Sequence, residues 1–382
     1  MKDTAKSGWV EKPLGEISTL QRGFDLPKRL REPGEFPLVT SSGPTDTHSE
    51  AKVKGPGVAT GRSGSIGNVF FVEDDFWPLN TALYVKDFHG NDPRFVYYLL
   101  NYVDLARFAS GAGVPTLNRN DVHGELYRIP ANIEEQQRIV AVLDEAFEGL
   151  ARARAHAEAN LEDSHEIAAR ALDVLIADLI ERNGRIPISE IAAVKGGKRL
   201  PKGEETSTVK TPFPYITVRD FTEDGTVSTE KLGFISEEVQ KGIARYTISS
   251  QDVYVSIAGT IGKSGIVPDE LDGANLTENA AKLVLEDGWS NEYIYWCTRS
   301  SDFGVQTAEQ TRVAAQPKLA LQRLGAITVP KADEAEQVEL CEKMAYLRST
   351  RSNLVVAYGQ KLQDLDNLRQ SLLQKAFAGE LT

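Results

Sequence analysis

Two long stretches of the chain carry the apolar spacing of an α-helix. Residues 133–182 contain no proline, one internal glycine, and apolar side chains three or four positions apart. These side chains are Ile139, Leu143, Ala146, Leu150, Ala153, Ala157, Leu161, Ala168, Leu172, Leu175 and Leu179. Residues 333–378 repeat the rhythm at Leu340, Met344, Leu347, Leu354, Tyr358, Leu365, Leu368 and Leu372. Steps of three and four average about 3.5 residues, the period of a coiled-coil seam.

Helices of this length cannot bury an apolar seam within one globular domain. At about 1.5 Å per residue, roughly 45 residues span about 70 Å. The simplest partner for each helix is the other one, packed antiparallel if the two are related by pseudo-twofold symmetry. We therefore predict two long antiparallel coiled-coil helices.

The remaining segments have the pattern of short strands. Runs such as "VFFV", "ALYV", "YITV", "DVYVSIAG" and "AKLVL" are bounded by glycine, proline and aspartate, and helices are expected near 92–106 and 290–300. We predict a mixed α/β fold with two globular lobes, residues 1–132 and 184–331. A spacer helix spans residues 133–183, and a second spacer helix with a C-terminal tail spans residues 332–382.

The sequence also repeats itself. "PLGEISTLQRGFDLPK" (13–28) aligns without gaps with "PISEIAAVKGGKRLPK" (187–202), at a constant offset of 174. Further matches, in order, are "FPLVT" (36–40) with "FPYIT" (213–217), "GSIG" (64–67) with "GTIG" (259–262), "NTALYV" (80–85) with "NAAKLV" (279–284), "FVYY" (95–98) with "YIYW" (293–296), "VPTLN" (114–118) with "QPKLA" (316–320), and "ELYRIP" (125–130) with "AITVP" (326–330). Each copy then passes through Glu-Gln into its long helix. A repeat of about 200 residues is too long for a solenoid unit, so we interpret it as a duplicated domain plus helix.

The repeat explains a glycine-rich segment that resembles a phosphate-binding loop. "SIAGTIGKSGIV" (256–267) contains Gly-Lys-Ser, but Ile257 occupies the position where that loop requires its first glycine. The first copy has Asn68 in place of Lys263. The shared element is therefore a Gly-x-Ile-Gly turn between strands.

Composition narrows the class of protein. With 41% hydrophobic and 26% charged residues, the chain is neither disordered nor membranous. No apolar run is long enough to span a membrane and no signal peptide is evident, so we expect a cytosolic protein. Cys297 and Cys341 lie in unrelated contexts, which argues against a disulfide framework or a zinc cluster.

The net charge of −12 is concentrated in one segment. Residues 134–182 carry −7, whereas residues 1–133 and 183–331 carry −1 and −2. Each nearly neutral segment opens with a basic run, namely Arg22, Lys28, Arg29 and Arg31 in the first and Lys195, Lys198, Arg199 and Lys202 in the second. The acidic total therefore does not exclude nucleic acid binding.

Catalytic motifs are absent. No [DNS]-P-P-[YFW] tetrapeptide of the amino-methyltransferases occurs, and the five histidines show no ligand spacing. We expect this chain to hold no metal or cofactor and to perform no catalysis itself.

Two segments resemble a known family. "ELYRIPANIEEQQRIVAVLDE" (125–145) and the terminal "SLLQKAFAGELT" (371–382), with the two Gly-x-Ile-Gly turns, resemble the specificity subunit of type I restriction-modification systems. The second helix start, "ADEAEQVELCEKM", departs from the pattern of aliphatic residues in the first.

The resemblance implies a non-catalytic DNA-recognition subunit. Each lobe would be a target recognition domain for one half of a bipartite site in double-stranded DNA. The helices would set the spacing and dock two modification subunits, which carry the S-adenosylmethionine chemistry, and restriction subunits using ATP and Mg would join the complex. The alternative is a duplicated coiled-coil adaptor that binds only proteins.

The candidate DNA-contacting residues follow from this reading. The two basic runs would contact phosphates. Arg62, Ser63, Arg119 and Arg219 are candidates for base-edge contacts, because arginine can read guanine bidentately. Lys263 and Lys318 complete the set.

Overall fold

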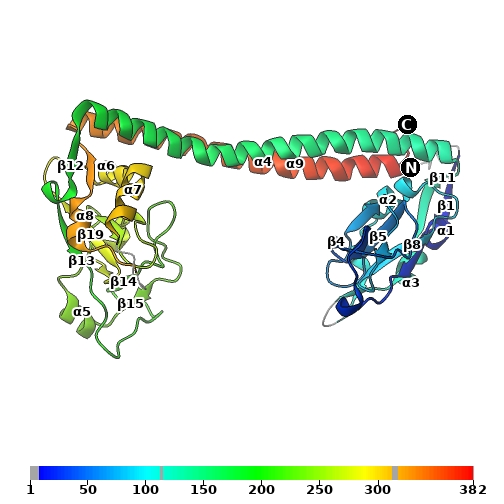
Figure 1. The fold of residues 1–382 in the computed structure, drawn as a ribbon, viewed down its shortest axis with the longest axis horizontal. Coiled ribbons are helices and arrows are strands. Elements are labelled where there is room, and N and C mark those ends of the chain that lie inside the picture. Colours follow the sequence, from blue (N-terminus) through cyan, green and yellow to red (C-terminus); the bar gives the residue numbers. More distant parts are fainter. Residues whose placement is uncertain (1–7, 112–114, 312–316, 382) are drawn as a thin grey trace, which may run out of the picture. The chain divides into compact units, whose positions relative to one another are not determined.

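The computed structural model describes residues 8–111, 115–311 and 317–381, which form two compact units. Unit 1 comprises Met1–Ala159 and Tyr358–Thr382, and unit 2 comprises Asn160–Ala357. Each unit combines one globular part with a portion of both long helices, α4 (Ile133–Asn183) and α9 (Glu334–Phe377) (Figure 1). The predicted mixed α/β class is confirmed.

The globular part of unit 1 is built on two small sheets. Its four-stranded sheet has the order β2-β8-β5-β6, and its three-stranded sheet has the order β4-β3-β7. Its elements are β1 (Trp9–Pro13), α1 (Leu14–Ile17), β2 (Thr19–Arg22), η1 (Lys28–Leu30), β3 (Phe36–Thr40), β4 (Gly43–His48), β5 (Gly57–Gly61), β6 (Val69–Val72), β7 (Trp77–Pro78), β8 (Ala82–Asp87), α2 (Pro93–Tyr102), η2 (Leu105–Phe108), β9 (Ala109–Ser110), β10 (Thr116–Leu117), α3 (Arg119–His123) and β11 (Leu126–Pro130).

Unit 2 repeats this plan. Its four-stranded sheet has the order β13-β19-β16-β17, and its three-stranded sheet has the order β15-β14-β18. Its elements are β12 (Arg185–Pro187), η3 (Ile188–Glu190), β13 (Ala192–Gly196), β14 (Pro214–Ile216), β15 (Gly233–Phe234), α5 (Glu237–Ile243), β16 (Val253–Ser256), β17 (Ser264–Ile266), η4 (Asp269–Leu271), β18 (Asn275–Leu276), β19 (Ala280–Leu285), α6 (Asn291–Arg299), α7 (Ser301–Gln310), α8 (Leu321–Ala326) and β20 (Thr328–Pro330).

Equivalent strand pairs show that the duplication extends to register. The antiparallel pair Arg22–Leu83 of β2 and β8 recurs as Gly196–Ala281 of β13 and β19. The parallel pair Leu38–Trp77 of β3 and β7 recurs as Tyr215–Asn275 of β14 and β18. Of the segments matched by sequence, Val114 and Gln316 lie outside the described residues.

One predicted alignment is wrong by a single position. The sequence match "NTALYV" with "NAAKLV" equates Asn80 with Asn279. In the structure the carbonyl of Thr81 accepts from Arg62 N at 2.9 Å, and the carbonyl of Asn279 accepts from Ile257 N at 2.8 Å. Thr81 is therefore the counterpart of Asn279. The shared asparagine misled the comparison, because backbone pairing and not side-chain identity sets the register of a strand.

A buried glutamine explains why Glu-Gln recurs where each long helix begins. Gln136 Oε1 accepts from the backbone N–H of Asp92 at 3.0 Å, and its Nε2 donates to Pro130 O at 3.0 Å. Asp92 is the N-cap of α2. In unit 2, Gln337 Oε1 accepts in the same way from Ser290 N, at the N-cap of α6, at 2.8 Å. Each glutamine thus joins a long helix to the helix that covers the sheet.

Within each unit the two long helices run antiparallel. In unit 1 the guanidinium of Arg369 lies 5.1 Å from the ring centroid of Phe147, and Asp366, one turn earlier on α9, pairs with Arg154, later on α4. In unit 2 Arg182, near the end of α4, pairs with Glu336, near the start of α9, at 2.7 Å.

Both helices contribute to the hydrophobic core of each unit. In unit 1 the core includes Ile139 and Leu143 from the start of α4 and Leu373 and Phe377 from the end of α9. Phe377 stacks on Tyr102 of α2 with ring centroids 5.0 Å apart. Because a buried leucine or phenylalanine stabilises by about 1.5–3 kcal/mol, the terminal segment is part of the fold of unit 1.

The predicted seam is wrong at two positions. Leu368 and Leu354, expected in the seam, are 48% and 37% exposed. The place expected for Leu368 is taken by Arg369, whose guanidinium covers Phe147.

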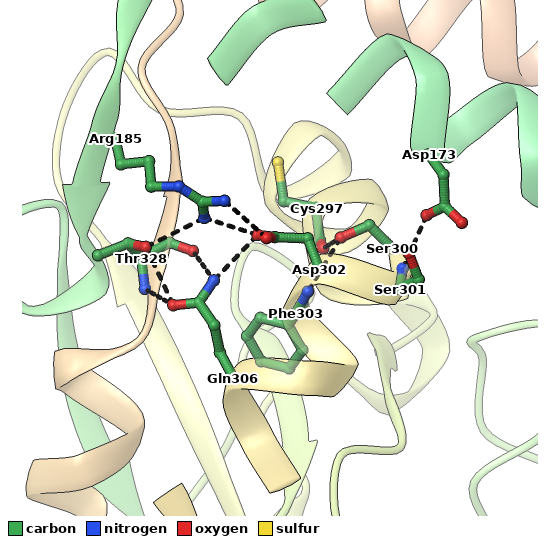
Figure 2. Close-up of polar contacts among 9 residues, drawn as sticks. All are labelled: Asp173, Arg185, Cys297, Ser300, Ser301, Asp302, Phe303, Gln306 and Thr328. Atoms are coloured by element: carbon green, nitrogen blue, oxygen red, sulfur yellow. Dashed lines mark hydrogen bonds and ion pairs between the residues drawn. The ribbon is translucent and has the colours of Figure 1, made fainter. Parts of the chain in front are cut away.

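In unit 2 a polar network fixes α7 against both α4 and the sheet-flanking strands (Figure 2). Arg185 donates bidentately to Asp302 at 2.7 Å for both bonds. Gln306 Nε2 donates to the carbonyl of Thr328 at 2.9 Å, and Asp173 of α4 accepts from Ser301 N at 2.8 Å. These bonds supply acceptors and donors that the ends of short helices otherwise lack.

The two cysteines lie in one hydrophobic core. Cys297 and Cys341, which come from unrelated sequence contexts, both pack in the core of unit 2 and are free thiols. Burial raises the pKa of the Cys341 thiol to about 12 and that of Cys297 still further. Thiols of this kind are poor nucleophiles.

The buried glutamine can be tested by hydrogen exchange. Gln136→Met removes the acceptor of Asp92 N–H, and a buried unsatisfied donor costs about 1–3 kcal/mol. We expect the amides at the start of α2 to exchange roughly tenfold to a hundredfold faster. Gln137→Met, at an exposed neighbouring position, is the matched control. Equal exchange in the two variants would show that the bond to Asp92 contributes nothing.

Candidate nucleic-acid interface

Three connecting loops meet at one end of the four-stranded sheet in unit 1. The pairs Arg22–Leu83, Gly61–Ala82 and Thr60–Val69 place the end of β2, the start of β8 and the β5–β6 turn beside one another. We call this group, residues 22–26, 62–68 and 79–81, the loop end of unit 1. β8 leaves the sheet at its other end, toward Asp92 and the bond with Gln136.

Unit 2 has the same arrangement. The pairs Gly196–Ala281, Ser256–Ala280 and Val255–Ser264 gather residues 196–200, 257–263 and 277–279, the loop end of unit 2. The segment after β14 joins this group, because Thr277 N donates to Ile216 O at 3.0 Å. Both loop ends are therefore built from corresponding parts of the repeat.

A glycine at each loop end allows two backbone segments to cross in contact. Gly23 N donates to Ala82 O at 3.0 Å, and its counterpart Gly197 donates to Ala280 O at 3.1 Å. A Cβ on Gly23 would lie 2.2 Å from the carbonyl oxygen of Leu79, and one on Gly197 would lie 2.1 Å from that of Thr277. No side chain fits there, which explains why the glycine recurs.

The Gly-x-Ile-Gly segments are turns, as predicted. Gly64 and Gly67 have φ of +86° and +92°, and Gly259 and Gly262 have φ of +78° and +90°. Each turn joins two antiparallel strands, β5 to β6 and β16 to β17. A phosphate-binding loop leads from a strand into a helix, so that interpretation of "GTIGKS" is excluded.

The structure brings some of the candidate residues of unit 1 together. Arg22 and Ser63 lie at the loop end, and so does Arg62, whose Nη1 donates to Asn80 O at 3.2 Å. Lys28, Arg29 and Arg31 follow in and after η1, and the first two are exposed. Arg119 is separate, since its Nη1 donates to Leu20 O within β2 at 3.4 Å.

The candidates of unit 2 are distributed similarly. Lys195 is exposed on β13, Lys198 and Arg199 follow the crossing glycine, and Lys202 lies slightly beyond. Lys263 is in the turn, and Lys318 pairs with Ala258 beside it. Arg219 is exposed in the segment after β14.

Carboxylates neutralise part of the predicted basic patches. Lys263 pairs with Glu223 at 2.7 Å, Arg199 with Glu278 at 2.6 Å, and Arg22 with Asp25 at 3.3 Å. The first two acidic partners lie 40 and 79 residues away in the sequence. The loop ends are therefore mixed in charge, and the basic runs overstate how positive they are.

These ion pairs change the acidity of their carboxylates. Burial alone would raise the pKa of Glu278, but hydrogen bonds from Arg199, its own backbone and Thr277 lower it overall. A hydrogen bond from Lys263 lowers the pKa of Glu223. Both groups are therefore charged at neutral pH, and both pairs persist there as ion pairs.

Sequence reasoning missed Asp25, Asn80 and Glu278. Asp25 Oδ1 accepts from Asn80 Nδ2 and from Arg22 Nη2. The constant offset of 174 equates Asp25 with Arg199, so the sequence did mark a position where the two copies differ in charge. Its partner position, Asn80 in one copy and Glu278 in the other, was hidden by the one-residue alignment error.

The described residues offer neither a metal-binding cluster nor a membrane-spanning helix. Among the residues that the structure describes, no group of three or more histidine, cysteine, aspartate and glutamate side chains could hold a metal ion. Within the same residues, no helix is both long and apolar enough to cross a membrane.

Comparison with known proteins shows what the chain is similar to. Residues 6–158 match the model of the type I restriction modification DNA specificity domain. The predicted resemblance to the type I specificity subunits is confirmed. The EcoBI type I restriction enzyme specificity subunit of Escherichia coli is 29% identical over 176 residues, which are 46% of this chain and 36% of that protein. The match thus spans about a third of the curated relative.

Solved structures share the fold over nearly the whole chain. A chain from a study of complex assembly and conformational transition in a type I restriction-modification system has a TM-score of 0.76 at 17% identity, covering 98% of this chain and 99% of its own. The HsdS subunit of Thermoanaerobacter tengcongensis has a TM-score of 0.62 at 17% identity, covering 98% of both chains.

The crossing glycines of the two units yield a stability test. Gly23→Ala and Gly197→Ala must displace a backbone carbonyl, and overpacking of this kind costs about 1–3 kcal/mol. Gly149→Ala is the control, because a Cβ there meets no atom of the described residues within 4 Å, discounting the helix's own backbone. In α4 it should stabilise by up to about 1 kcal/mol. Urea unfolding of the full chain measures all three, and a Gly197→Ala protein as stable as its parent would contradict the crossing geometry.

Proposed function

We propose that the chain is the DNA-recognition subunit of a type I restriction-modification complex. Two lobes, residues 1–132 and 184–331, each read one half of a bipartite site, and the antiparallel helices between them set the spacing. The observation that carries this proposal is the pair of equivalent loop ends: one backbone frame, used twice, presents two different sets of polar side chains. Two lobes with the same backbone and different side chains would recognise two half-sites of different base sequence.

The candidate contacts keep their predicted division of labour in this proposal. Exposed lysines and arginines of the basic runs contact phosphates and fix the register of the protein on the duplex. Because lobes at net −1 and −2 and a helix at −7 attract a polyanion weakly, much of the positive charge must come from partner subunits. Modification subunits with S-adenosylmethionine and restriction subunits with ATP and Mg are these partners, in a cytosolic complex.

Docking of modification subunits on the helices is supported by an apolar groove in unit 2. The groove, of about 450 Å³, is lined by Arg170, Ala171, Val174, Leu175, Lys343, Tyr346 and Leu347. Val174 and Tyr346 are 68% and 72% exposed, and both line this groove, so they expose apolar area together. The equivalent positions of unit 1 carry Lys375 and Glu145, so the two docking surfaces differ in chemistry.

Exchange of one lobe tests modular recognition. Replacing residues 1–130 by the equivalent lobe of a related specificity subunit should change only one half-site, because each lobe has its own sheet and loop end. Methylome sequencing of cells that carry the complete system reads both half-sites at once. The reciprocal exchange of residues 184–331 is the matched control and should change the other half. A single exchange that alters both halves would mean that the lobes read DNA jointly.

Lengthening the helices tests their role as a ruler. Four residues inserted near Glu158 in α4, together with four near Tyr358 in α9, preserve antiparallel pairing while adding about 6 Å and about 40° of rotation. At about 3.4 Å per base pair, the spacer should grow by one or two base pairs while both half-sites stay the same. Methylome sequencing of the variant beside its parent is the measurement. An unchanged spacer with full activity would leave the helices as docking surfaces only.

A further inference from the structure

The two loop ends hold different side chains at one equivalent pair of positions. Asp25 and Arg199 each stand two residues after the crossing glycine. Asn80 and Glu278 each stand two residues before the strand that this glycine contacts, β8 or β19. In unit 1 Asp25 accepts a hydrogen bond from Asn80, and in unit 2 Arg199 Nε donates to Glu278 Oε1 at 2.6 Å. We call this pair of positions the clasp. It is a carboxylate–amide pair, Asp25 with Asn80, in unit 1 and an arginine–carboxylate pair, Arg199 with Glu278, in unit 2.

The clasp of unit 2 leaves the reading end of an arginine free. The Arg199 side chain is 78% exposed, whereas that of Glu278 is 24% exposed. Among the described residues, Arg199 donates a hydrogen bond only through Nε, to Glu278. Its two terminal nitrogens, Nη1 and Nη2, therefore remain available to a ligand. Glu278 is itself anchored, because its Oε2 accepts from Thr277 Oγ1 at 3.0 Å. An arginine held by Nε loses less conformational freedom when its terminal nitrogens bind a ligand.

The geometry is that of a preorganised base reader. Two parallel N–H donors at the end of a guanidinium match O6 and N7 of guanine in the major groove. The clasp of unit 1 presents the opposite chemistry: Asp25 is exposed and is held by Asn80 and Arg22. A carboxylate accepts from the N4 amino group of cytosine. A phosphate can also accept from an arginine fork, so a base contact and a phosphate contact are distinguished by whether a substitution relaxes one base position or weakens binding uniformly.

We propose that this clasp is a specificity-determining pair, in which Arg199, positioned by Glu278, reads a guanine in the half-site of unit 2. At the equivalent position of unit 1, Asp25, positioned by Asn80, reads a cytosine amino group. The inference rests on the proposed function. It goes further by assigning base-reading roles to Arg199, which the sequence placed among phosphate contacts, and to Asp25. Glu278 and Asn80 act as positioning residues, and the sequence did not single out Asp25, Glu278 or Asn80.

The test uses the complete complex and two readouts. Arg199→Ala and Arg199→Lys should each accept any base at one position of one half-site, with binding to the parent duplex weakened roughly tenfold to a hundredfold. Lysine keeps the charge but loses the bidentate fork, so it should not rescue the guanine. Lys202→Ala is the matched control: it should weaken binding equally on all sequences and reduce the salt slope by about one. Unchanged melting temperatures show that the exposed substitutions leave the fold intact.

Glu278 is tested as a positioning residue by a double-mutant cycle. Glu278→Ala should relax the same base position, and Glu278→Ala with Arg199→Ala should be no weaker than Arg199→Ala alone. Asp25→Ala should relax a position in the other half-site only. The proposal is overturned if the Arg199 variants methylate the parent motif with every base still required, or weaken binding uniformly as Lys202→Ala does. A parent complex without any sequence preference would instead contradict the proposed function.

Discussion

The bond between a buried glutamine and a helix N-cap is the interaction on which each unit depends. Gln136 and Gln337 are buried, and each accepts from the backbone N–H of a cap residue, Asp92 or Ser290. Leaving a buried side-chain amide without hydrogen-bond partners costs more free energy than a surface hydrogen bond contributes. The long helix and the covering helix are therefore held in a single relative position within each unit. Since the covering helix packs on the sheet, the glutamine also fixes where the sheet stands on the long helix. This constraint serves both copies, although little else in their helix starts is alike.

At the other end of the sheet the constraint is steric. In each unit one glycine, Gly23 or Gly197, lets its segment cross a neighbouring segment in contact. Main-chain hydrogen bonds at that crossing hold the backbone of the loop end. Side chains beside that crossing do not hold the backbone in place, so they can differ between the two units. Asp25 and Arg199, opposite in charge at equivalent positions, show the consequence. A scaffold that is rigid in its backbone and variable in its side chains can change what it binds without being redesigned.

The sequence predicted the parts that follow from periodicity and local chemistry. The long helices obey a period that reports burial of one face, and the Gly-x-Ile-Gly turns require φ values that glycine adopts freely. What failed depended on contacts between distant residues. The match at Asn80 was wrong by one position because identity of a side chain competes poorly with strand register, and Leu368 lost its seam position to Arg369, whose partner Phe147 lies on the other helix. The acidic partners of Arg199 and Lys263 could not be read from sequence, because only the sheet brings residues so far apart together.

The ion pairs of the loop ends bear on how an acidic protein can favour one DNA sequence over another. A free cation attracts any phosphate, and its contribution falls steeply with salt. Under the proposed function, an arginine already paired with a carboxylate gains less from the field of the duplex, because Glu278 would repel the same phosphates that Arg199 attracts. The paired arginine keeps its full binding energy only for hydrogen bonds to a base, because the carboxylate does not repel the base as it repels a phosphate. Pairing therefore lowers the electrostatic affinity for every DNA sequence but keeps the free-energy difference between the correct base and the others. As the net charge of the loop end approaches zero, the ratio of specific to non-specific binding rises.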